Sequence, residues 1–314
     1  MKIRIYKSKI KKILSLALPL WMVIVISFQS SAAIGIAEYY ILHKEFNKSL
    51  SELAEKTKSP DELLQILKQE VLPKDGYTLG VTWGDIGQRL LETGVIDKEK
   101  YKELFSQDPG DTKMMNYLTH GSKDHMKISE ANSNFMVNTL WALGLVNKNE
   151  ILEKGAMKTY GQGDPMQYAS TGGWNLGTKN TDKLYSSAQI ITLTSEQQAL
   201  VEKIASTIYR PCCGNPVSFP DCNHGMAVLG YIELAVKEGI SENKIYKDVL
   251  ALNSFWFPQQ YVTLAAYFKQ QKTDWNKIDS KLALGNNYSS SQGTNDIMQK
   301  VRDIPGLTSK GGSC

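Results

Sequence analysis

Signals that begin helices recur along this chain, while apolar and polar residues almost never alternate with a period of two. Capping boxes at residues 59–62 and 194–197 each precede an apolar run with helical spacing. The best period-two segment, residues 188–193, is short. We therefore expect an all-α fold. The helices are expected at about 60–72, 83–92, 97–105, 129–144, 194–209, 223–238, 242–256, 259–270 and 294–303.

Two regions qualify that helical pattern. Thr82 is predicted to cap the helix at 83–92, which Gly94 separates from the helix at 97–105, so these two helices should form a hairpin. Residues 156–187 are rich in glycine and are expected to be a long irregular loop. Their Gly-Gly motif lacks the Lys-Ser/Thr of a phosphate loop, so no nucleotide cofactor is expected.

The N-terminal segment has the pattern of an export signal. Six Lys and Arg side chains precede an apolar stretch that runs from residue 13 to 37 with one polar interruption at 29–31. A helix of about 20 residues spans a bilayer, so an uncleaved signal anchor is favoured, and a signal peptide cleaved near residue 33 is the alternative. Because the cations precede the apolar stretch, the bulk of the chain should lie outside the cytoplasm, at the cell surface or in the periplasm.

The charge distribution and the pattern of elements divide the chain into four parts. Removing the six N-terminal charges from the net charge of +4 leaves −2 for the rest, so a nucleic-acid partner is not expected. The expected parts are the anchor at 1–37, juxtamembrane helices at 38–75, a helical domain with a Cys/His site at 76–304 and a flexible thiol tail at 305–314.

Three of the four cysteines, Cys212, Cys213 and Cys222, lie within eleven residues, and His224 follows them. The cluster occupies the connection between two expected helices, which places Cys222 and His224 at a helix N-terminus. The positive end of the helix dipole there favours a thiolate, and Arg210 would act in the same direction. Concentrated thiols of this kind indicate metal or redox chemistry.

A soft-metal site is the first hypothesis for the cluster. Thiolates and an imidazole select Zn(II), Cu(I) or Hg(II) over hard cations, and Cys212, Cys213, Cys222 and His224 supply up to four ligands. Side chains of adjacent cysteines diverge, so one of the pair is expected to stay free for exchange. The predicted function is therefore binding or transfer of a soft metal, with a metal or thiol donor or acceptor protein as partner.

Other interpretations of the cluster remain open. A disulfide from Cys222 to Cys212 or Cys213 would make it a staple of a structural domain, as is common outside the cytoplasm. A thiol–disulfide oxidoreductase would use Cys213 or Cys222 as the thiolate and His224 as the base. An iron–sulfur cluster is the fourth interpretation.

Residues outside the cluster are candidates for supporting roles. Cys314 follows a Gly-Gly-Ser stretch typical of flexible linkers and is a candidate transfer thiol. Asp221 is a candidate to orient His224. His120 and His125 are candidate accessory residues on an expected loop, although hydrogen-bonded or solvent-exposed roles fit them as well.

Several motifs together resemble a family of membrane-anchored bacterial proteins that end in a Gly-rich cysteine tail. The resemblance is carried by residues 209–215 (Tyr-Arg-Pro-Cys-Cys-Gly-Asn), 219–226 (Phe-Pro-Asp-Cys-Asn-His-Gly-Met), 253–258, 170–174 and 139–145. The chain is also similar to the C-terminal-thiol (seleno)proteins of the selenocysteine-assisted organometal gene cluster. That similarity implies handling of mercury or organomercurials by thiol transfer, although a single Cys314 departs from the family's paired terminus.

Overall fold

The computed structural model describes residue 44 and residues 60–106, 111–160, 163–304 and 307. The chain divides into two compact units, residues 1–58 and 59–314, so every described residue except residue 44 belongs to the second unit. The expected signal anchor at 1–37 and the expected transfer thiol Cys314 lie outside the described residues. Among the residues that are described, no helix has both the length and the apolar character needed to cross a membrane.

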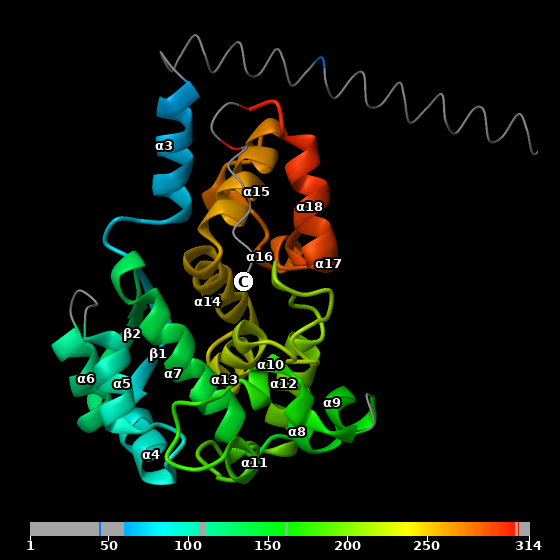
Figure 1. The fold of residues 1–314 in the computed structure, drawn as a ribbon. Coiled ribbons are helices and arrows are strands. Elements are labelled where there is room, and N and C mark those ends of the chain that lie inside the picture. The colour runs from blue at the N-terminus through cyan, green and yellow to red at the C-terminus, as the bar shows by residue number, and fades with distance from the viewer. Residues whose placement is uncertain (1–43, 45–59, 107–110, 161–162, 305–306, 308–314) are drawn as a thin grey trace, which may run out of the picture. The chain divides into compact units, whose positions relative to one another are not determined.

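The second unit is mostly helical, with one small sheet, as Figure 1 shows. This confirms the helical class in its coarse form. The longer helices are α3 (Pro60–Val71), α4 (Ile86–Thr93), α5 (Lys98–Phe105), α6 (Asp111–Thr119), α7 (Ser133–Val146), α12 (Ser195–Ala205), α13 (Asn223–Lys237), α14 (Glu242–Trp256), α15 (Pro258–Gln270) and α18 (Ser291–Lys300). Short helical turns are η1 (Glu130–Asn132), α8 (Glu150–Lys154), η4 (Trp275–Lys277), α16 (Ser280–Ala283) and α17 (Asn286–Ser289).

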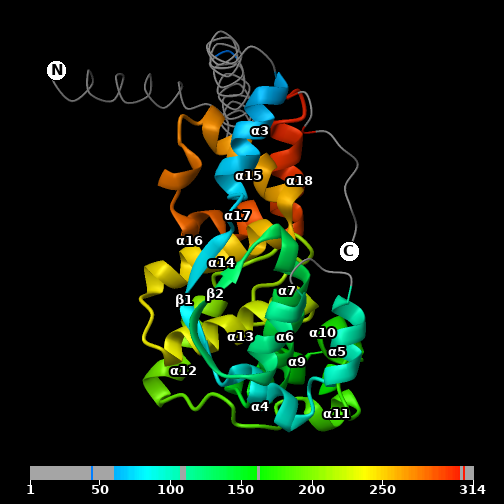
Figure 2. The same ribbon diagram turned by 90° about the vertical axis from the view of Figure 1, so that its left-hand side faces the viewer.

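The sheet is the main departure from the expected fold. Strand β1 (Tyr77–Gly84) pairs antiparallel with β2 (Ser122–Ile128), and the two lie side by side in Figure 2. Thr82 does not cap a helix, because it lies on β1 opposite His125, and α4 begins only after Asp85. Residues 188–193 were the best strand candidate, yet their ladder is limited to one isolated bridge from Ala188 to Asn147.

The expected hairpin of α4 and α5 is not the principal packing in this region. Helix α4 lies against α6, where the backbone of Tyr117 and Leu118 would meet a side chain at Gly87 within 2.2–2.9 Å. The turn between α4 and α5 does form as expected, because Gly94 adopts φ 76° and its N–H caps Leu91 O.

The described part of the expected irregular loop at 156–187 includes several short helical turns. These are α9 (Ala156–Thr159), η3 (Pro165–Gln167), α10 (Ala169–Gly172) and α11 (Thr181–Leu184). Trp174 fixes the segment to the domain: its ring lies 4.8 Å from that of Trp141, and its Nε1 donates to Val95 O at 2.9 Å. The N–H of Ser170 donates to Asp221 O at 3.1 Å, which ties the segment to the cysteine-containing connection.

Helices α7 and α13 make the closest helix crossing in the core. A Cβ added at Gly144 would lie 2.1 Å from Met226 O, and one added at Gly230 would lie 2.5 Å from Leu140 O. Only glycine permits this approach of two backbones. Since α13 carries the cysteine site at its N-terminus, this crossing fixes the position of the site.

Two buried acids on α13 and α14 join further elements. Asp248 on α14 is fully buried and accepts hydrogen bonds from Tyr231 OH on α13 and from Tyr77 OH and Gly80 N on β1, the last two at 2.9 Å. Lys244 forms the ion pair that balances the charge of Asp248. Glu233 on α13 is fully buried and accepts from Asn147 Nδ2 at 2.8 Å.

Replacing Gly144 by alanine should destabilise the protein by about 2 kcal/mol or more, because the new methyl group forces α7 and α13 apart. Chemical denaturation of the two proteins measures the change. Gly214→Ala is the matched control, since the nearest atom to its added Cβ is Ser291 Oγ at 4.0 Å. Equal free energies of unfolding for wild type and Gly144→Ala would contradict the close crossing.

The Glu233→Gln variant tests the buried carboxyl group. Burial raises the pKa of Glu233 well above its ordinary value, so the folded state holds the proton to higher pH than the unfolded state. The contribution of this proton to the free energy of unfolding is fully present below the unfolded pKa of about 4.3. It is lost as the pH rises through the folded pKa.

Glutamine is neutral at every pH. Glu233→Gln should therefore gain stability over wild type by about 1.4 kcal/mol for each pH unit above about 4.3, up to the folded pKa. Urea unfolding at several pH values measures the difference. If the free energies of unfolding of the two proteins differ by the same amount at every pH, the pKa of Glu233 is the same in the folded and unfolded states, and the prediction is wrong.

Candidate thiol and metal site

The cysteine-containing connection folds back on the end of α12. Ser218 N donates to Ala205 O at 3.0 Å, and Val217 N donates to Ile208 O at 2.9 Å. The helix expected to reach residue 209 ends at Ala205, whose carbonyl accepts the hydrogen bond from the returning Ser218. This folding brings Cys212 beside Cys222, ten positions later in the chain.

The three thiols and one imidazole of the cluster come together as the sequence predicted. Cys222 Sγ lies 3.3 Å from Cys212 Sγ, and the thiol of Cys213 donates to Cys212 Sγ at 3.6 Å. His224 Nδ1 lies 4.0 Å from Cys212 Sγ. All four side chains are half-buried, and the three cysteines are free thiols.

Cys222 is the N-cap residue of α13. Its sulfur accepts a hydrogen bond from Gly225 N at 3.3 Å, in the place where a capping serine or aspartate oxygen would accept. The open N–H groups of a helix start and the positive end of its dipole both favour negative charge on this sulfur. The helix itself thus helps to ionise Cys222.

Arg210 is fully buried beside Cys222. Its Nε donates to Cys222 Sγ at 3.2 Å, and its other nitrogens reach Asn215 O at 2.5 Å and Phe219 O at 3.2 Å. It also forms an ion pair with Asp221. These partners are spread along the connection from Asn215 to Cys222, so one guanidinium group holds this segment in shape.

Gly225 makes room for that guanidinium group. A Cβ at this position would lie 2.7 Å from Arg210 Cζ. The motif that ends in Asn-His-Gly therefore needs glycine because Arg210 packs directly under the first turn of α13. The sequence pattern alone did not reveal this role of Gly225.

The electrostatics divide the thiols into one thiolate and two protonated groups. Hydrogen bonds from Cys212 and Cys213 lower the pKa of Cys222 well below its ordinary value, with further contributions from His224 and the charge of Arg210, while burial opposes them. Hydrogen bonding to Cys213 and Cys222, together with burial, raises the pKa of Cys212. The arrangement therefore favours negative charge on Cys222 over Cys212.

Cys213 is the second protonated thiol. Its hydrogen bond with Cys212 would lower its pKa, but the hydrogen bond with Cys222, burial and the charge of Cys222 outweigh this and raise the pKa to about 12. Neighbouring charges also shift the pKa of the Arg210 guanidinium. Burial opposes its charge, yet the charge of Cys222, the hydrogen bond to Cys222 and the charge of Asp221 keep the pKa of Arg210 above its ordinary value.

Aromatic side chains close one side of the cluster. The ring of His224 lies 4.4 Å from that of Phe257 and 5.7 Å from that of Trp256, where α14 ends and α15 begins. Both rings belong to the Phe-Trp-Phe-Pro motif at 255–258. The motif forms part of the wall around the imidazole.

The other expected site residues lie elsewhere. His125 is exposed on β2, and His120 is exposed at the end of α6, where its Nδ1 lies 2.9 Å from Thr119 Oγ1. Among the described residues, the groups of side chains that could hold a metal ion include neither His120 nor His125. Asp221 does lie in the cluster, but it pairs with Arg210 and accepts from Asn215 Nδ2 at 2.9 Å.

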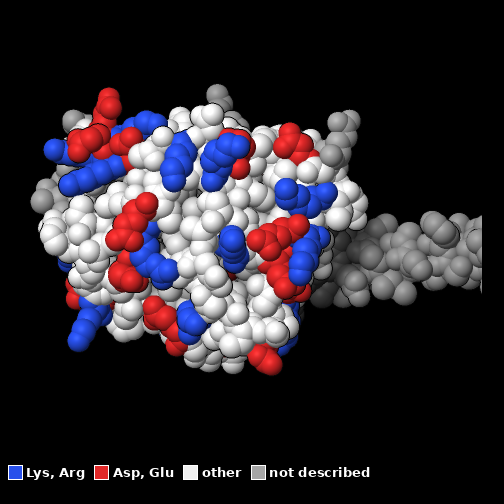
Figure 3. Space-filling model, turned by 90° about the horizontal axis from the view of Figure 1, so that it is seen from below, with Lys and Arg blue, Asp and Glu red and all other residues white. Residues whose placement is uncertain are grey.

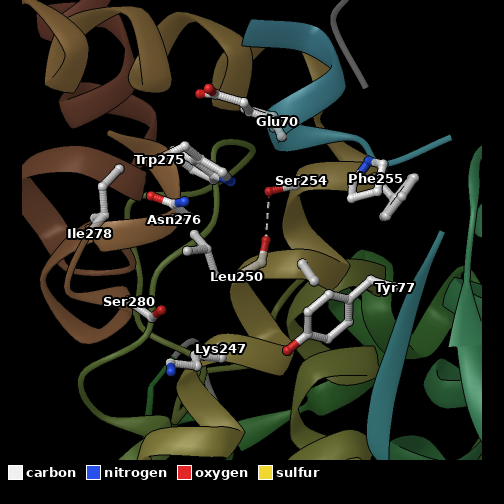
Figure 4. Close-up of a pocket in the computed structure, with 13 residues that line it drawn as sticks. Glu70, Tyr77, Lys247, Leu250, Ser254, Phe255, Trp275, Asn276, Ile278 and Ser280 are labelled. Carbon is white, nitrogen blue, oxygen red and sulfur yellow. Dashed lines mark hydrogen bonds between the residues drawn. The ribbon is translucent and has the colours of Figure 1, made fainter. Parts of the chain in front are cut away.

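A cavity of about 250 Å³ lies away from the thiols, between α3, β1, α14 and η4. Figure 4 shows Trp275 and Asn276 on one side of it and Tyr77 on the other, with Lys247 at one end. Ser254 in its wall is occupied by a hydrogen bond to Leu250 O at 2.7 Å. None of the described residues that line this cavity is a cysteine or histidine, so the thiol cluster stands as a separate site.

Charged side chains on the face seen in Figure 3 are mixed in sign. Lysine and arginine lie among aspartate and glutamate there, and no large field of one sign gathers on the described part of that face. Ion pairs such as Lys203 with Glu242 and Lys277 with Asp274 also bring opposite charges together in the described part of the chain.

The ionisation of Cys222 can be tested on the reduced, metal-free protein. Wild type should show far-ultraviolet thiolate absorbance at neutral pH, below the ordinary cysteine pKa of about 8.5. Cys222→Ser should remove that absorbance, whereas the matched variant Cys213→Ser should keep most of it. Arg210→Gln should raise the pKa of Cys222, because a cation that favours the thiolate is lost. Thiolate absorbance that begins only above about pH 8.5 in wild type would contradict this assignment.

No known family model matches this chain, and no curated protein or solved structure is similar to it. The resemblance drawn from the motifs at 209–215 and 219–226 therefore stays a prediction. The chemistry of the site follows from its own residues and geometry.

Proposed function

We propose that Cys212, Cys222 and His224 bind a soft metal ion such as Zn(II), Cu(I) or Hg(II), and that the protein carries this ion for exchange with other thiols. The observation that carries the proposal is the assembly of the three ligand atoms within 4.8 Å of one another. A loop thiol, a helix-cap thiol and an imidazole are brought together in the connection and the first turn of α13.

The distances suit a tetrahedral ion. With metal–sulfur bonds of about 2.3 Å and metal–nitrogen bonds of about 2.0 Å, two sulfurs should lie about 3.8 Å apart and a sulfur and a nitrogen about 3.5 Å apart. The observed 3.3 Å between Cys212 and Cys222 and 4.0 Å between Cys212 and His224 differ from these values by about half an ångström. Small side-chain rotations are enough to admit the ion.

The charge of the site also favours a thiophilic cation. Cys222 is ionised before the ion arrives, so binding has to displace a proton only from Cys212 among the two sulfur ligands. Arg210 already neutralises part of the sulfur charge, and Asp221 balances Arg210. The half-buried position of the ligands leaves them open to exchange, which suits a carrier better than a closed structural site.

A second function is favoured by the short distance between Cys212 and Cys222. In thiol–disulfide exchange, the Cys222 thiolate attacks a substrate disulfide, releasing one substrate thiolate and forming a mixed disulfide. Cys212 then loses its proton and attacks Cys222 Sγ, releasing the second substrate thiolate and leaving a Cys212–Cys222 disulfide. The substrate is reduced and the two cysteines are oxidised.

The N-terminal sequence supports a cellular location for the proposed metal carrier. We propose that residues 1–37 anchor the protein in a membrane with the thiol site outside the cytoplasm, where a donor or acceptor protein delivers or removes the ion. The two functions differ in what the reduced protein holds. A carrier binds metal in a fixed ratio, and an oxidoreductase does not require metal.

Metal binding is tested on protein purified under reducing, chelator-free conditions. Wild type should bind one equivalent of zinc. Cys212→Ser, Cys222→Ser and His224→Ala should each weaken zinc affinity by more than the roughly 10–100-fold that loss of an outer-shell partner costs. Competition with a chromophoric chelator measures the affinity.

Cys213→Ser is the matched control, because it removes a neighbouring thiol that is not assigned as a ligand, and its affinity should stay within about tenfold of wild type. Absence of metal above background after reloading would reject the carrier function. A stable Cys212–Cys222 disulfide with a defined reduction potential in the same protein would then support thiol–disulfide exchange.

A further inference from the structure

The three sulfurs of the cluster form a small triangle. Cys222 Sγ lies 3.3 Å from Cys212 Sγ, Cys213 Sγ lies 3.6 Å from Cys212 Sγ, and Cys213 Sγ and Cys222 Sγ lie within 4.8 Å of each other. The side chains of the adjacent cysteines therefore converge, although the sequence predicted that they would diverge. All three side chains are half-buried, so part of each remains open to solvent.

Contacts from separate segments hold two corners of this triangle. Cys213 is fixed through its backbone: its N–H donates to Arg210 O at 3.2 Å, and its carbonyl accepts from Ser291 N, in the first turn of α18, at 2.9 Å. Cys222 Sγ accepts hydrogen bonds from Gly225 N at 3.3 Å and from Arg210 Nε at 3.2 Å. These contacts favour the triangular arrangement of the sulfurs, as a site for a small ligand requires.

The triangle is smaller than a tetrahedral ion needs. A tetrahedral ion with metal–sulfur bonds of about 2.3 Å holds its sulfurs about 3.8 Å apart. Trivalent arsenic binds three thiolates in a pyramid, because a lone pair occupies its fourth side and narrows the angles between its bonds to values between a right angle and the tetrahedral angle. With bonds of about the same 2.3 Å, the sulfurs of such a pyramid lie about 3.3–3.8 Å apart. The distances of 3.3 Å and 3.6 Å both fall in this range.

A pyramid of this kind needs no nitrogen ligand. His224 Nδ1 lies 4.0 Å from Cys212 Sγ, farther than either neighbouring sulfur, and its ring lies 4.4 Å from that of Phe257. Because the lone pair takes the place of a fourth ligand, three sulfurs complete the site. The cluster therefore offers two ligand sets that share Cys212 and Cys222. They differ in the third member, which is His224 for zinc and Cys213 for arsenic.

We propose that Cys212, Cys213 and Cys222 together bind a trivalent metalloid, with arsenite as the representative ligand. The inference deepens the proposed function and rests on it in one respect, that the cysteines act as ligand thiols and are not joined in a disulfide. On binding, three arsenic–oxygen bonds of arsenous acid break and three arsenic–sulfur bonds form. The three hydroxyl groups leave as water with the thiol protons, or with a proton from solvent where a sulfur is already ionised. Arsenic stays trivalent, so no oxidant or reductant takes part.

Arsenite binding is tested in the full-length protein with Cys314→Ser, which leaves the three cluster cysteines as the only thiols of the chain. With a phosphine as reductant, native mass spectrometry should show one arsenic atom gained and three hydrogen atoms lost. Competition with a dithiol chelator measures the affinity. Adding Cys213→Ser should weaken arsenite binding by about 100-fold or more, because the third linked bond is lost. His224→Ala is the matched control and should change arsenite affinity by less than about tenfold.

Phenylarsine oxide separates loss of the third sulfur from loss of the fold. One of its arsenic bonds is already made to carbon, so it needs only two thiols. Cys213→Ser should therefore bind phenylarsine oxide as tightly as the parent protein does. Zinc should give the reverse of the arsenite pattern, with affinity lost in His224→Ala and kept in Cys213→Ser.

Four results would overturn the inference while leaving the zinc site intact: no binding of arsenite, equal arsenite affinity in Cys213→Ser and its parent, loss of only two hydrogen atoms on binding, or loss of arsenite affinity in His224→Ala. Failure to bind zinc, with arsenite still held through three sulfurs, would instead reject the proposed zinc carrier and support the inference. The two failures are therefore distinguishable.

Discussion

The buried charge of Arg210 is the constraint on which the site depends. A guanidinium group without solvent is costly unless anionic and hydrogen-bonding partners surround it. Here the partners are the Asp221 carboxylate, the Cys222 sulfur and the carbonyls of Asn215 and Phe219, all from one short connection. Satisfying this one charge forces the connection to fold around it. The same arrangement places an anionic sulfur at the start of α13.

Contacts with the core fix the position of helix α13, and the site lies at the start of this helix. Its backbone touches α7 at Gly230, its Tyr231 hydroxyl donates to the buried Asp248, and its Glu233 pairs with Asn147. A helix fixed at so many points cannot shift without cost to the core. Cys222, at its first turn, is therefore held in one position. This is the preorganisation that the proposed metal site requires.

The sequence predicted helices better than strands, for physical reasons that particular residues illustrate. Helices α13 and α14 begin and end within one residue of the expected bounds, because capping and apolar spacing are local properties. Strand β1 was missed although Leu79, Val81 and Trp83 alternate and are buried, since Thr82 also suited a helix cap. Strand β2 is mostly polar and exists only through its pairing with β1.

The amino-acid sequence by itself determined the helical class, the clustering of Cys212, Cys213, Cys222 and His224, and the position of Cys222 at a helix start. These follow from spacing along the chain, which needs no distant partner. Only the tertiary structure decided that Arg210 is buried against Cys222, that Gly225 makes room for it, and that Trp256 and Phe257 pack beside the ring of His224. Such relations depend on contacts between segments far apart in sequence, and local patterns carry no record of them.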